Sequence, residues 1–158
     1  MGARQGIIAS EHTSGIYIRR LALDGTAKEF KVSKDDQSTQ NNALTTMYVH
    51  GNRIYIGGAT KASWGGQAAQ GGYDNMVIKL EKTETDIQKK WVKQWGTSGK
   101  DVIYGLVMAQ DGNLYVSGYT EGLLGKKAFG AKDIMVAKVK EDDGTLLKTI
   151  QFGSPSDD

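Results

Sequence analysis

The chain has 158 residues and a net charge of only +2, from 20 lysine and arginine residues against 18 aspartate and glutamate residues. This balance argues against a dedicated nucleic-acid-binding protein, and no stretch reaches the ~20 apolar residues of a membrane span. The absence of cysteine excludes disulfides, thiolate zinc sites and a cysteine nucleophile, and two histidines leave little material for histidine-based catalysis.

Residues 1–42 predict an incomplete, degenerate copy of the units that follow. The segment Ile16–Leu21 resembles Met76–Leu80, and Asp24-Gly25 is a hairpin turn signal because glycine tolerates positive φ. We expect three short strands between about residues 6 and 33.

Residues 43–101 and 102–158 predict two complete units of a repeat. Three pairs of segments match in the same order, at spacings of 57 to 60 residues. Such periods indicate a repeat fold. The pairs are Gly51–Thr60 with Gly112–Thr120, Asp74–Leu80 with Asp133–Val139, and Gln94–Asp101 with Gln151–Asp158.

Each complete unit predicts four short antiparallel strands separated by turns. Val102–Met108 is densely apolar, as expected of a strand that is buried on both faces, whereas Leu146–Phe152 mixes polar and apolar residues, as is typical of an edge strand. Ala43–Val49 and Val102–Met108 should be the innermost strands. We therefore predict an all-β fold of about eleven strands in three sheets: about three blades of a β-propeller, the first of them incomplete.

The repeated motifs resemble a known family. They are Gly-Asn-x-Tyr-Val-x-Gly-x-Thr, then Gly-x-x-Asp before an apolar strand, then Gln-aromatic-Gly-x-x-x-x-Asp. Together they resemble the bacterial β-propeller repeat family abbreviated SBBP, well over Gly51–Asp158 and poorly over the first 50 residues. The resemblance implies a propeller, usually in exported or surface-associated proteins, with no shared reaction. We therefore expect an extracellular or cell-surface location, although the chain shows no signal-peptide pattern.

Two loops, Lys61–Tyr73 and Glu121–Lys132, each join the predicted second strand of a unit to its third. Both loops should share one face with the crossing Gly96–Asp101. Aromatic and apolar loop residues beside aspartates could bind a sugar or a peptide, and they could equally fold inward and fill the loop. The candidate ligand-binding residues are Trp64, Tyr119, Asp101 and Asp133.

The aspartates beside the turns have two interpretations. A carboxylate before a strand can accept hydrogen bonds from loop N–H groups, and several converging carboxylates could hold Ca²⁺, which takes six to eight oxygen ligands. The EF-hand spacing is absent. We expect turn capping, with no metal site and no cofactor. The residues concerned are Asp74, Asp101, Asp133 and Asp158.

Other repeated residues point to packing. Gly58 and Gly118 lie inside a strand, where they either admit a ligand or permit close packing between strands; we expect packing. Repeated residues in a repeat fold are usually core residues. We expect this of three pairs, Tyr55 with Tyr115, Met76 with Met135 and Met47 with Met108.

No catalytic constellation can be assembled, so the sequence predicts a non-catalytic module for binding or scaffolding, with a glycan or a protein as ligand. One alternative is a half-propeller that assembles into a closed ring, and another is a propeller hydrolase or lyase with its site on the axis. Propellers contain ~4–8 blades. A three-blade arc should therefore expose an apolar flank to missing blades or to another copy of the chain joined head to tail.

Overall fold

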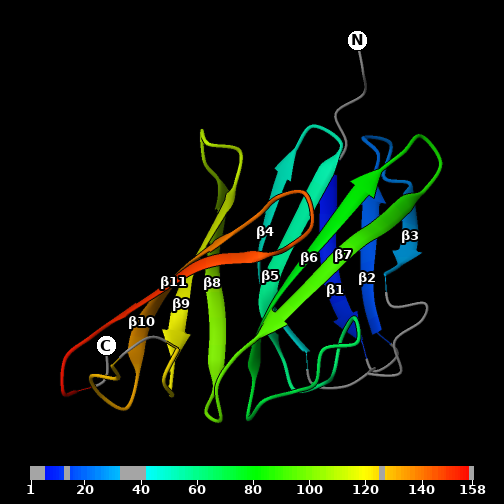
Figure 1. The fold of residues 1–158 in the computed structure, drawn as a ribbon. Helices are drawn as coiled ribbons and strands as arrows, with labels where there is room; N and C mark the ends of the chain where they lie inside the picture. The colour runs from blue at the N-terminus through cyan, green and yellow to red at the C-terminus, as the bar shows by residue number, and fades with distance from the viewer. Residues whose placement is uncertain (1–5, 13–14, 33–41, 125–126, 157–158) are drawn as a thin grey trace.

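The computed structural model describes residues 6–12, 15–32, 42–124 and 127–156, and within them it contains eleven β-strands and no helix (Figure 1). Asp158, which the sequence places beside a turn, lies outside the described residues. The strands are β1 (Gly6–His12), β2 (Gly15–Leu21), β3 (Ala27–Lys31), β4 (Asn42–His50), β5 (Arg53–Thr60), β6 (Asp74–Lys82), β7 (Ile87–Trp95), β8 (Asp101–Met108), β9 (Leu114–Thr120), β10 (Asp133–Val139) and β11 (Leu146–Phe152).

The strands form three antiparallel sheets, each built from strands that are consecutive in the chain. Their orders are β1-β2-β3, β4-β5-β6-β7 and β8-β9-β10-β11. Figure 1 shows the sheets side by side, with β8–β11 on the left, β4–β7 in the middle and β1–β3 on the right. The predicted all-β fold with sheets of three, four and four strands is confirmed.

The first strands of the two larger sheets lie close together. β8 packs against β4, β5 and β6, and β1 packs against β4. The hydroxyl of Thr45 in β4 donates a hydrogen bond to the carbonyl of Ile103 in β8, so these strands are linked directly. This position agrees with the prediction that they are the innermost strands.

A β-bulge recurs at the same place in both larger sheets, and it explains the strand glycines. The register shifts between Leu44 and Thr46 in one sheet and between Ile103 and Gly105 in the other. Opposite these bulges, a Cβ atom on Gly58 would lie 2.0 Å from the Ala43 carbonyl oxygen, and one on Gly118 would lie 1.9 Å from that of Val102. The packing interpretation of both glycines is confirmed, because only glycine fits this approach.

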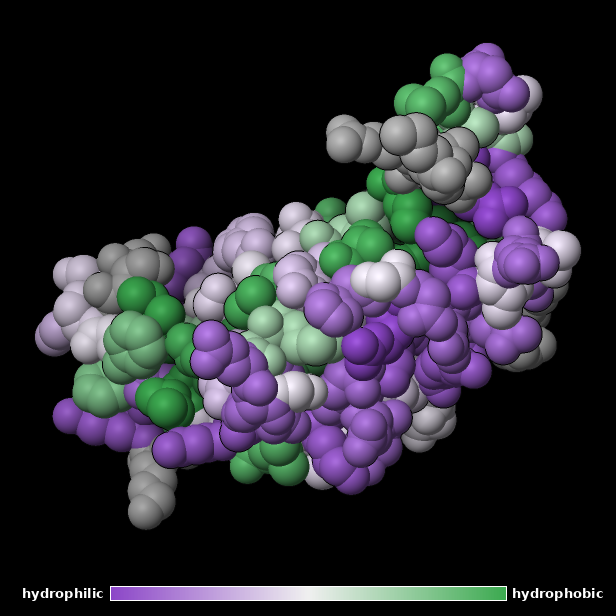
Figure 2. Space-filling model, turned by 90° about the horizontal axis from the view of Figure 1, so that it is seen from above, coloured by the Kyte–Doolittle hydropathy of each residue, from purple (hydrophilic) through white to green (hydrophobic). Residues whose placement is uncertain are grey.

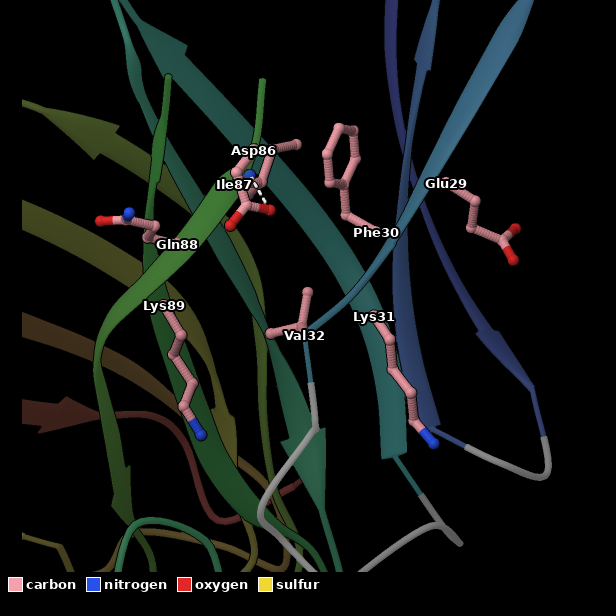
Figure 3. A pocket seen from close by; sticks show the side chains of 8 residues that line it. All are labelled: Glu29, Phe30, Lys31, Val32, Asp86, Ile87, Gln88 and Lys89. Atoms are coloured by element: carbon pink, nitrogen blue, oxygen red, sulfur yellow. Dashed lines mark hydrogen bonds between the residues drawn. The ribbon is translucent and has the colours of Figure 1, made fainter. Parts of the chain in front are cut away.

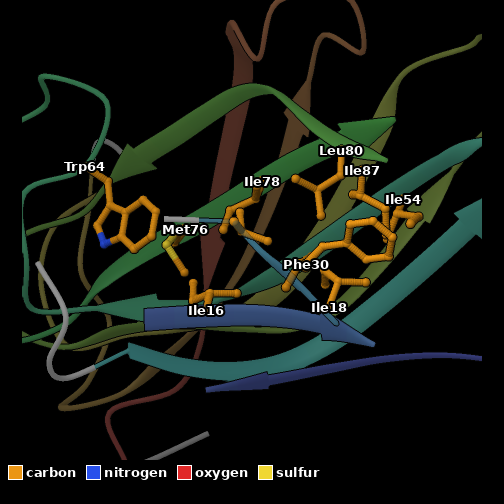
Figure 4. Packing of buried hydrophobic residues seen from close by; sticks show 11 residues of the cluster. Ile16, Ile18, Phe30, Ile54, Trp64, Met76, Ile78, Leu80 and Ile87 are labelled. Atoms are coloured by element: carbon orange, nitrogen blue, oxygen red, sulfur yellow. The ribbon is translucent and has the colours of Figure 1, made fainter. Parts of the chain in front are cut away.

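Two hydrophobic cores fill the spaces between neighbouring sheets. The first joins Ile16, Ile18 and Phe30 to the facing residues of β5 and β6 (Figure 4). The second joins Tyr55, Val77 and Trp95 of the middle sheet to β8–β10. The sheets therefore pack face to face in chain order.

The predicted equivalence of Met47 and Met108 is wrong, although both side chains contact a core. Met47 pairs with Ile56, whereas Met108 pairs with Leu114, the counterpart of Ile54. Five residues separate the paired Met108 and Leu114, whereas four separate the equivalent pair Val49 and Ile54, so matching the two methionines by residue type misplaces them in the register.

Candidate functional site

The two predicted loops lie against the crossing between the second and third sheets. The N–H of Gly72 donates to the Gly99 carbonyl at 2.8 Å, and the N–H of Asp101 donates to the Tyr73 carbonyl at 2.6 Å. From the other loop, the N–H of Glu121 donates to the Lys100 carbonyl at 2.8 Å. The prediction that both loops share a face with this crossing is confirmed.

Trp64 is folded inward. Its side chain is 0% exposed, and its ring points into the first core beside Met76 (Figure 4). Its indole Nε1 donates to Asn42 Oδ1 at 3.2 Å, and its backbone N–H donates to Gln94 Oε1 at 2.9 Å. Of the two interpretations that the sequence leaves open for this loop tryptophan, the structure shows the inward one.

Asp133 holds the loop that precedes it. Its carboxylate accepts hydrogen bonds from the N–H groups of Phe129 at 2.8 Å and Gly130 at 2.9 Å, and from Gln151 Nε2 at 2.7 Å. The hydrogen bond from the Phe129 N–H is the main reason that the pKa of Asp133 lies below its usual range. Asp74 repeats this arrangement, with Oδ2 accepting from the Gln70 N–H at 2.9 Å. Both aspartates cap turns.

Two glutamines complete these loop anchors, and reasoning from the sequence missed their role. Gln94 Nε2 donates to Asp74 Oδ2 at 2.7 Å, while its Oε1 accepts from the backbone of Trp64. Gln151 makes the same pair of bonds, to Asp133 and from the Leu124 N–H. The signal was present in the repeat, because both glutamines occupy the same place in their units.

Asp101 is buried where the chain passes from the second sheet to the third. Its Oδ2 accepts from the N–H of Thr97 at 2.6 Å and from the Thr97 hydroxyl at 3.0 Å. A Cβ atom on Gly96 would lie 2.4 Å from Asp74 Oδ1 and 2.8 Å from Asp101 Oδ2, so the two carboxylates converge there. Burial, and to a lesser extent the charge of Asp74, raise the pKa of Asp101.

The four candidate residues do not form one exposed site. Asp101 and Asp133 flank Thr120 across β8, β9 and β10, but both carboxylates are buried and occupied by loop N–H groups. Tyr119 is half-buried, with its ring centroid 5.9 Å from that of Tyr104. Burial is the main reason that the pKa of Tyr119 is raised. Of these residues, Tyr119 alone has substantial exposure.

A polar cluster locks the second sheet to the third. Glu141, in the turn between β10 and β11, accepts a hydrogen bond from the Tyr55 hydroxyl and lies 2.6 Å from Lys79 Nζ. Arg53 Nη1 lies 3.4 Å from the same oxygen, and Trp91 Nε1 donates to the Glu141 carbonyl at 3.0 Å. Sequence analysis did not single out Glu141, because its partners lie far away in the sequence.

A comparison with known families bears on the segment that crosses between these two sheets. Residues 90–125 match the model of the SBBP family, described as a beta-propeller repeat. The chain contains an SBBP repeat. No curated protein matches the chain. The described residues include no helix that could span a membrane.

The three sheets are accordingly blades of a propeller, and the third blade has one uncovered face. We call this the free face; it is turned away from the second blade. Hydrophobic atoms gather at this end of the molecule, on the left in Figure 2. Side chains alternate across a sheet, and the apolar members of this face are exposed or half-buried. The free face comprises Tyr104, Val107, Tyr115, Ser117, Tyr119, Ile134, Val136, Lys138, Lys148, Ile150 and Phe152.

The same face of the second blade is covered. Trp95 is 6% exposed, whereas Phe152, which follows the equivalent glutamine, is 45% exposed. Asn75 is 0% exposed, whereas Ile134, which follows the equivalent aspartate, is 37% exposed. The difference arises because the third blade packs on the second, while no described residue packs on the free face of the third.

The free face carries counterparts of Tyr55 and Lys79, the two residues that bind Glu141 between the second and third blades, but these counterparts have a different partner. Tyr115 and Lys138 occupy the places of Tyr55 and Lys79 in the register. Both bind Asp111 in their own blade, the tyrosine hydroxyl at 3.0 Å and Lys138 Nζ at 2.7 Å. The hydrogen bond from Lys138 is the main reason that the pKa of Asp111 lies well below its usual range.

An open cleft of about 510 Å³ lies between the outer strands of the first two blades. Figure 3 shows Phe30 and Val32 on one side of it and Ile87 on the other. The polar residues of its lining are all exposed or half-buried, so none is held in a fixed, desolvated position. They are Glu29, Lys31, Asp86, Gln88 and Lys89.

Proposed function

We propose that the chain is a non-catalytic β-propeller module that binds another protein through the free face and so acts as a scaffold. One observation carries this proposal: the free face is apolar and exposed, while the equivalent face of the second blade is buried. Contiguous exposed apolar surface on a folded domain marks an interaction site.

The composition of the free face supports a protein partner over a glycan. Aliphatic side chains such as Val107, Ile134 and Ile150 contribute much of its exposed surface, and they offer no hydrogen bonds to sugar hydroxyls. Trp64, the aromatic candidate for stacking on a sugar, lies inside the first core. Aliphatic and aromatic surface of this kind resembles the core of a protein–protein interface.

The use of the buried polar groups supports a non-catalytic role. Asp101 and Asp133 each hold loop N–H groups, and Gln94 and Gln151 each bridge an aspartate to a loop. A catalytic acid or base needs at least one position free for a substrate. All four side chains are buried and fix loops, and the one oxygen among them that has no hydrogen-bond partner, Asp101 Oδ1, is itself buried.

We also propose that the module works outside the cell or at the cell surface. SBBP repeats occur in bacterial surface proteins, which supports this location. A chain without cysteine can function in an oxidising environment without forming unwanted disulfides.

A second candidate function is self-assembly, in which the free face meets another copy of the chain. The exposed apolar area favours it over a purely monomeric role. Sedimentation over a wide range of protein concentration distinguishes the two, because only self-assembly makes the mass increase with concentration.

The experiment that tests the proposed function measures binding of the dye ANS, which reports exposed apolar surface. The double substitution Ile150→Ser and Phe152→Ser should reduce the ANS signal by about half or more, because it removes two of the exposed apolar side chains of the free face. The control is Val49→Ser and Leu123→Ser, two exposed apolar residues off the free face. Equal signals from both double variants would show that the free face is not a distinct apolar surface.

A further inference from the structure

Asp74 of β6 and Asp101 of β8 meet where the chain crosses from the second blade to the third, at a place separate from the free face. We propose that these two carboxyl groups share one proton and form a pH-sensitive joint between the two blades. The joint is tight while the proton is held, and it loosens when the proton is lost to solvent and two like charges remain. It lies at the loop end of the junction, whereas Glu141 lies at the end formed by the outer turns.

The two carboxyl groups approach each other beside Gly96. A Cβ atom on this glycine would lie 2.4 Å from Asp74 Oδ1 and 2.8 Å from Asp101 Oδ2, so both oxygens border the same small space. The backbone holds them there, because the N–H of Asp101 donates to the carbonyl of Tyr73, the residue before Asp74, at 2.6 Å. The start of β8 is therefore fixed against the start of β6.

Both carboxyl groups are shielded from water, and each keeps one oxygen without a hydrogen-bond partner. Asp74 is 1% exposed and Asp101 is 0% exposed. Loop N–H groups bind Oδ2 of each residue, but Oδ1 of each is unpartnered. Two buried carboxylates this close are not both ionised unless a positive charge neutralises them. One proton removes the repulsion and turns one carboxyl group into a hydrogen-bond donor.

No cationic side chain of the described residues neutralises the pair. Neither aspartate forms an ion pair within this part of the chain. Lys100 is exposed, while Lys61 and Lys132 lie over the rings of tyrosines outside the pair. The other titratable side chains around the pair are phenols or acids and bring no positive charge. They are Tyr73, Tyr119, Glu121 and Asp133.

The titration of Asp101 supports the shared proton. Burial is the main reason that the pKa of Asp101 is raised, and the charge of Asp74 raises it further. The neighbouring Thr120 and Thr97 lower this pKa only in part. Asp133 provides the contrast, since its two oxygens are both bound by loop N–H groups and its pKa lies below its usual range. Burial thus favours opposite charge states at two neighbouring aspartates.

The position equivalent to Asp101 in the second blade carries a neutral residue of the same shape. Asn42 pairs with Thr60 as Asp101 pairs with Thr120. Asn42 Oδ1 accepts a hydrogen bond from Trp64 Nε1 at 3.2 Å. The blade therefore needs an acceptor at this position and does not need a charge. A carboxyl group that holds a proton meets the same requirement.

The joint should respond to pH in a defined direction. A carboxyl group with a raised pKa in the folded state binds its proton more tightly there than in the unfolded chain. Its contribution to stability is complete below the unfolded-state pKa of about 3.9, and it is lost as the pH rises toward the folded-state value. The carboxylate of Glu141 has the opposite dependence, because its pKa is lowered. Acid should therefore tighten the loop end of the junction and weaken its other end.

The first test removes the charge and keeps the shape. Asp101→Asn should raise the midpoint of urea unfolding at pH 7 by about 0.3 M or more, and this gain should disappear below about pH 4. Asp133→Asn is the matched control and should lower the midpoint at pH 7, because the charge of Asp133 is stabilised by its loop. An Asp101→Asn variant that is less stable than the wild type at both pH values would overturn the inference.

The second test follows the proton directly and uses the wild type as well as a variant. In NMR titrations of the side-chain carboxyl carbons, Asp101 should titrate about one pH unit or more above 3.9. In Asp74→Asn this midpoint should fall by about one unit, because an amide group would replace the second charge. A wild-type midpoint at or below 3.9, or one that Asp74→Asn leaves unchanged, would overturn the shared proton. A urea midpoint that depends on Ca²⁺ and not on pH would also overturn it and assign the two oxygens to a cation.

Discussion

Tyr55 in β5 donates its phenolic hydrogen to the carboxylate of Glu141, which lies 86 residues later in the chain and in the next blade. Burial is the main reason that the pKa of Tyr55 is raised, and the neighbouring carboxylate adds to it. The tyrosine therefore stays protonated, and so remains a hydrogen-bond donor, well above neutral pH. This bond and the ion pair with Lys79 fix how the second and third blades meet.

Removal of this hydrogen bond should destabilise the protein. We expect Tyr55→Phe to lower the free energy of unfolding by about 1.5–3 kcal/mol, because the lost bond is to a charged, desolvated acceptor. Urea denaturation followed by tryptophan fluorescence measures the change. Tyr115→Phe is the matched control, since its hydroxyl binds the exposed Asp111, and it should cost under about 1 kcal/mol. Equal costs for the two variants would contradict the interpretation.

Acid should weaken the same interface. Burial alone would raise the pKa of Glu141, but the hydrogen bonds from Lys79 and Tyr55 and the charges of Lys79 and Arg53 outweigh it and hold the pKa below its usual range. A carboxylate with a lowered pKa in the folded state stabilises the protein above its unfolded-state pKa of about 4.3, and this contribution is lost as the pH falls toward the folded-state value.

We therefore expect the stability difference between the wild type and Glu141→Gln to be largest at neutral pH and to shrink below about pH 4. Urea titrations from neutral to acidic pH measure it. Asp142→Asn is the control, since it removes a negative charge from an exposed position next to Glu141. A constant difference for Glu141→Gln across this range would mean that its carboxylate is not stabilised by the interface.

The glycines opposite the bulges should tolerate no side chain. Gly58→Ala and Gly118→Ala should each cost about 3 kcal/mol or more, because the new methyl group would overlap a backbone carbonyl that is fixed by the sheet. Gly6→Ala is the control, since its Cβ would meet Leu21 at an ordinary 3.8 Å. Thermal unfolding monitored by circular dichroism measures the loss of stability in each variant. Wild-type stability in either strand variant would show that the close approach in β4–β5 or β8–β9 can relax.

Trp64 should behave as a core residue. Trp64→Ala should lower the free energy of unfolding by about 3–5 kcal/mol, because it empties a fully buried site. Phe129 lies in the equivalent loop of the third blade and is exposed, so Phe129→Ala should cost no more than about 1 kcal/mol. Chemical denaturation measures the free energy of unfolding of both variants. A stable Trp64→Ala variant with reduced affinity for a sugar or peptide would restore the binding interpretation.

The strands, their order in the sheets and the close packing at Gly58 and Gly118 could all be predicted from the sequence. These features depend on local patterns, namely apolar runs, turn residues and glycine, and the repeat shows each pattern twice. The capping roles of Asp74 and Asp133 could be predicted for the same reason, because a carboxylate that caps a loop bonds to N–H groups within a few residues of itself.

Other features were decided only when the blades packed together. Whether Trp64 turned inward depended on the first core, which β2 and β3 of another blade complete. The partners of Glu141 lie in a different sheet, and no spacing in the sequence brings them together. The repeat also predicts equivalent positions for Phe152 and Trp95, yet Phe152 is exposed and Trp95 is buried. Their burial differs because it depends on what covers a blade, and that is a property of the neighbouring blade and not of the repeat itself.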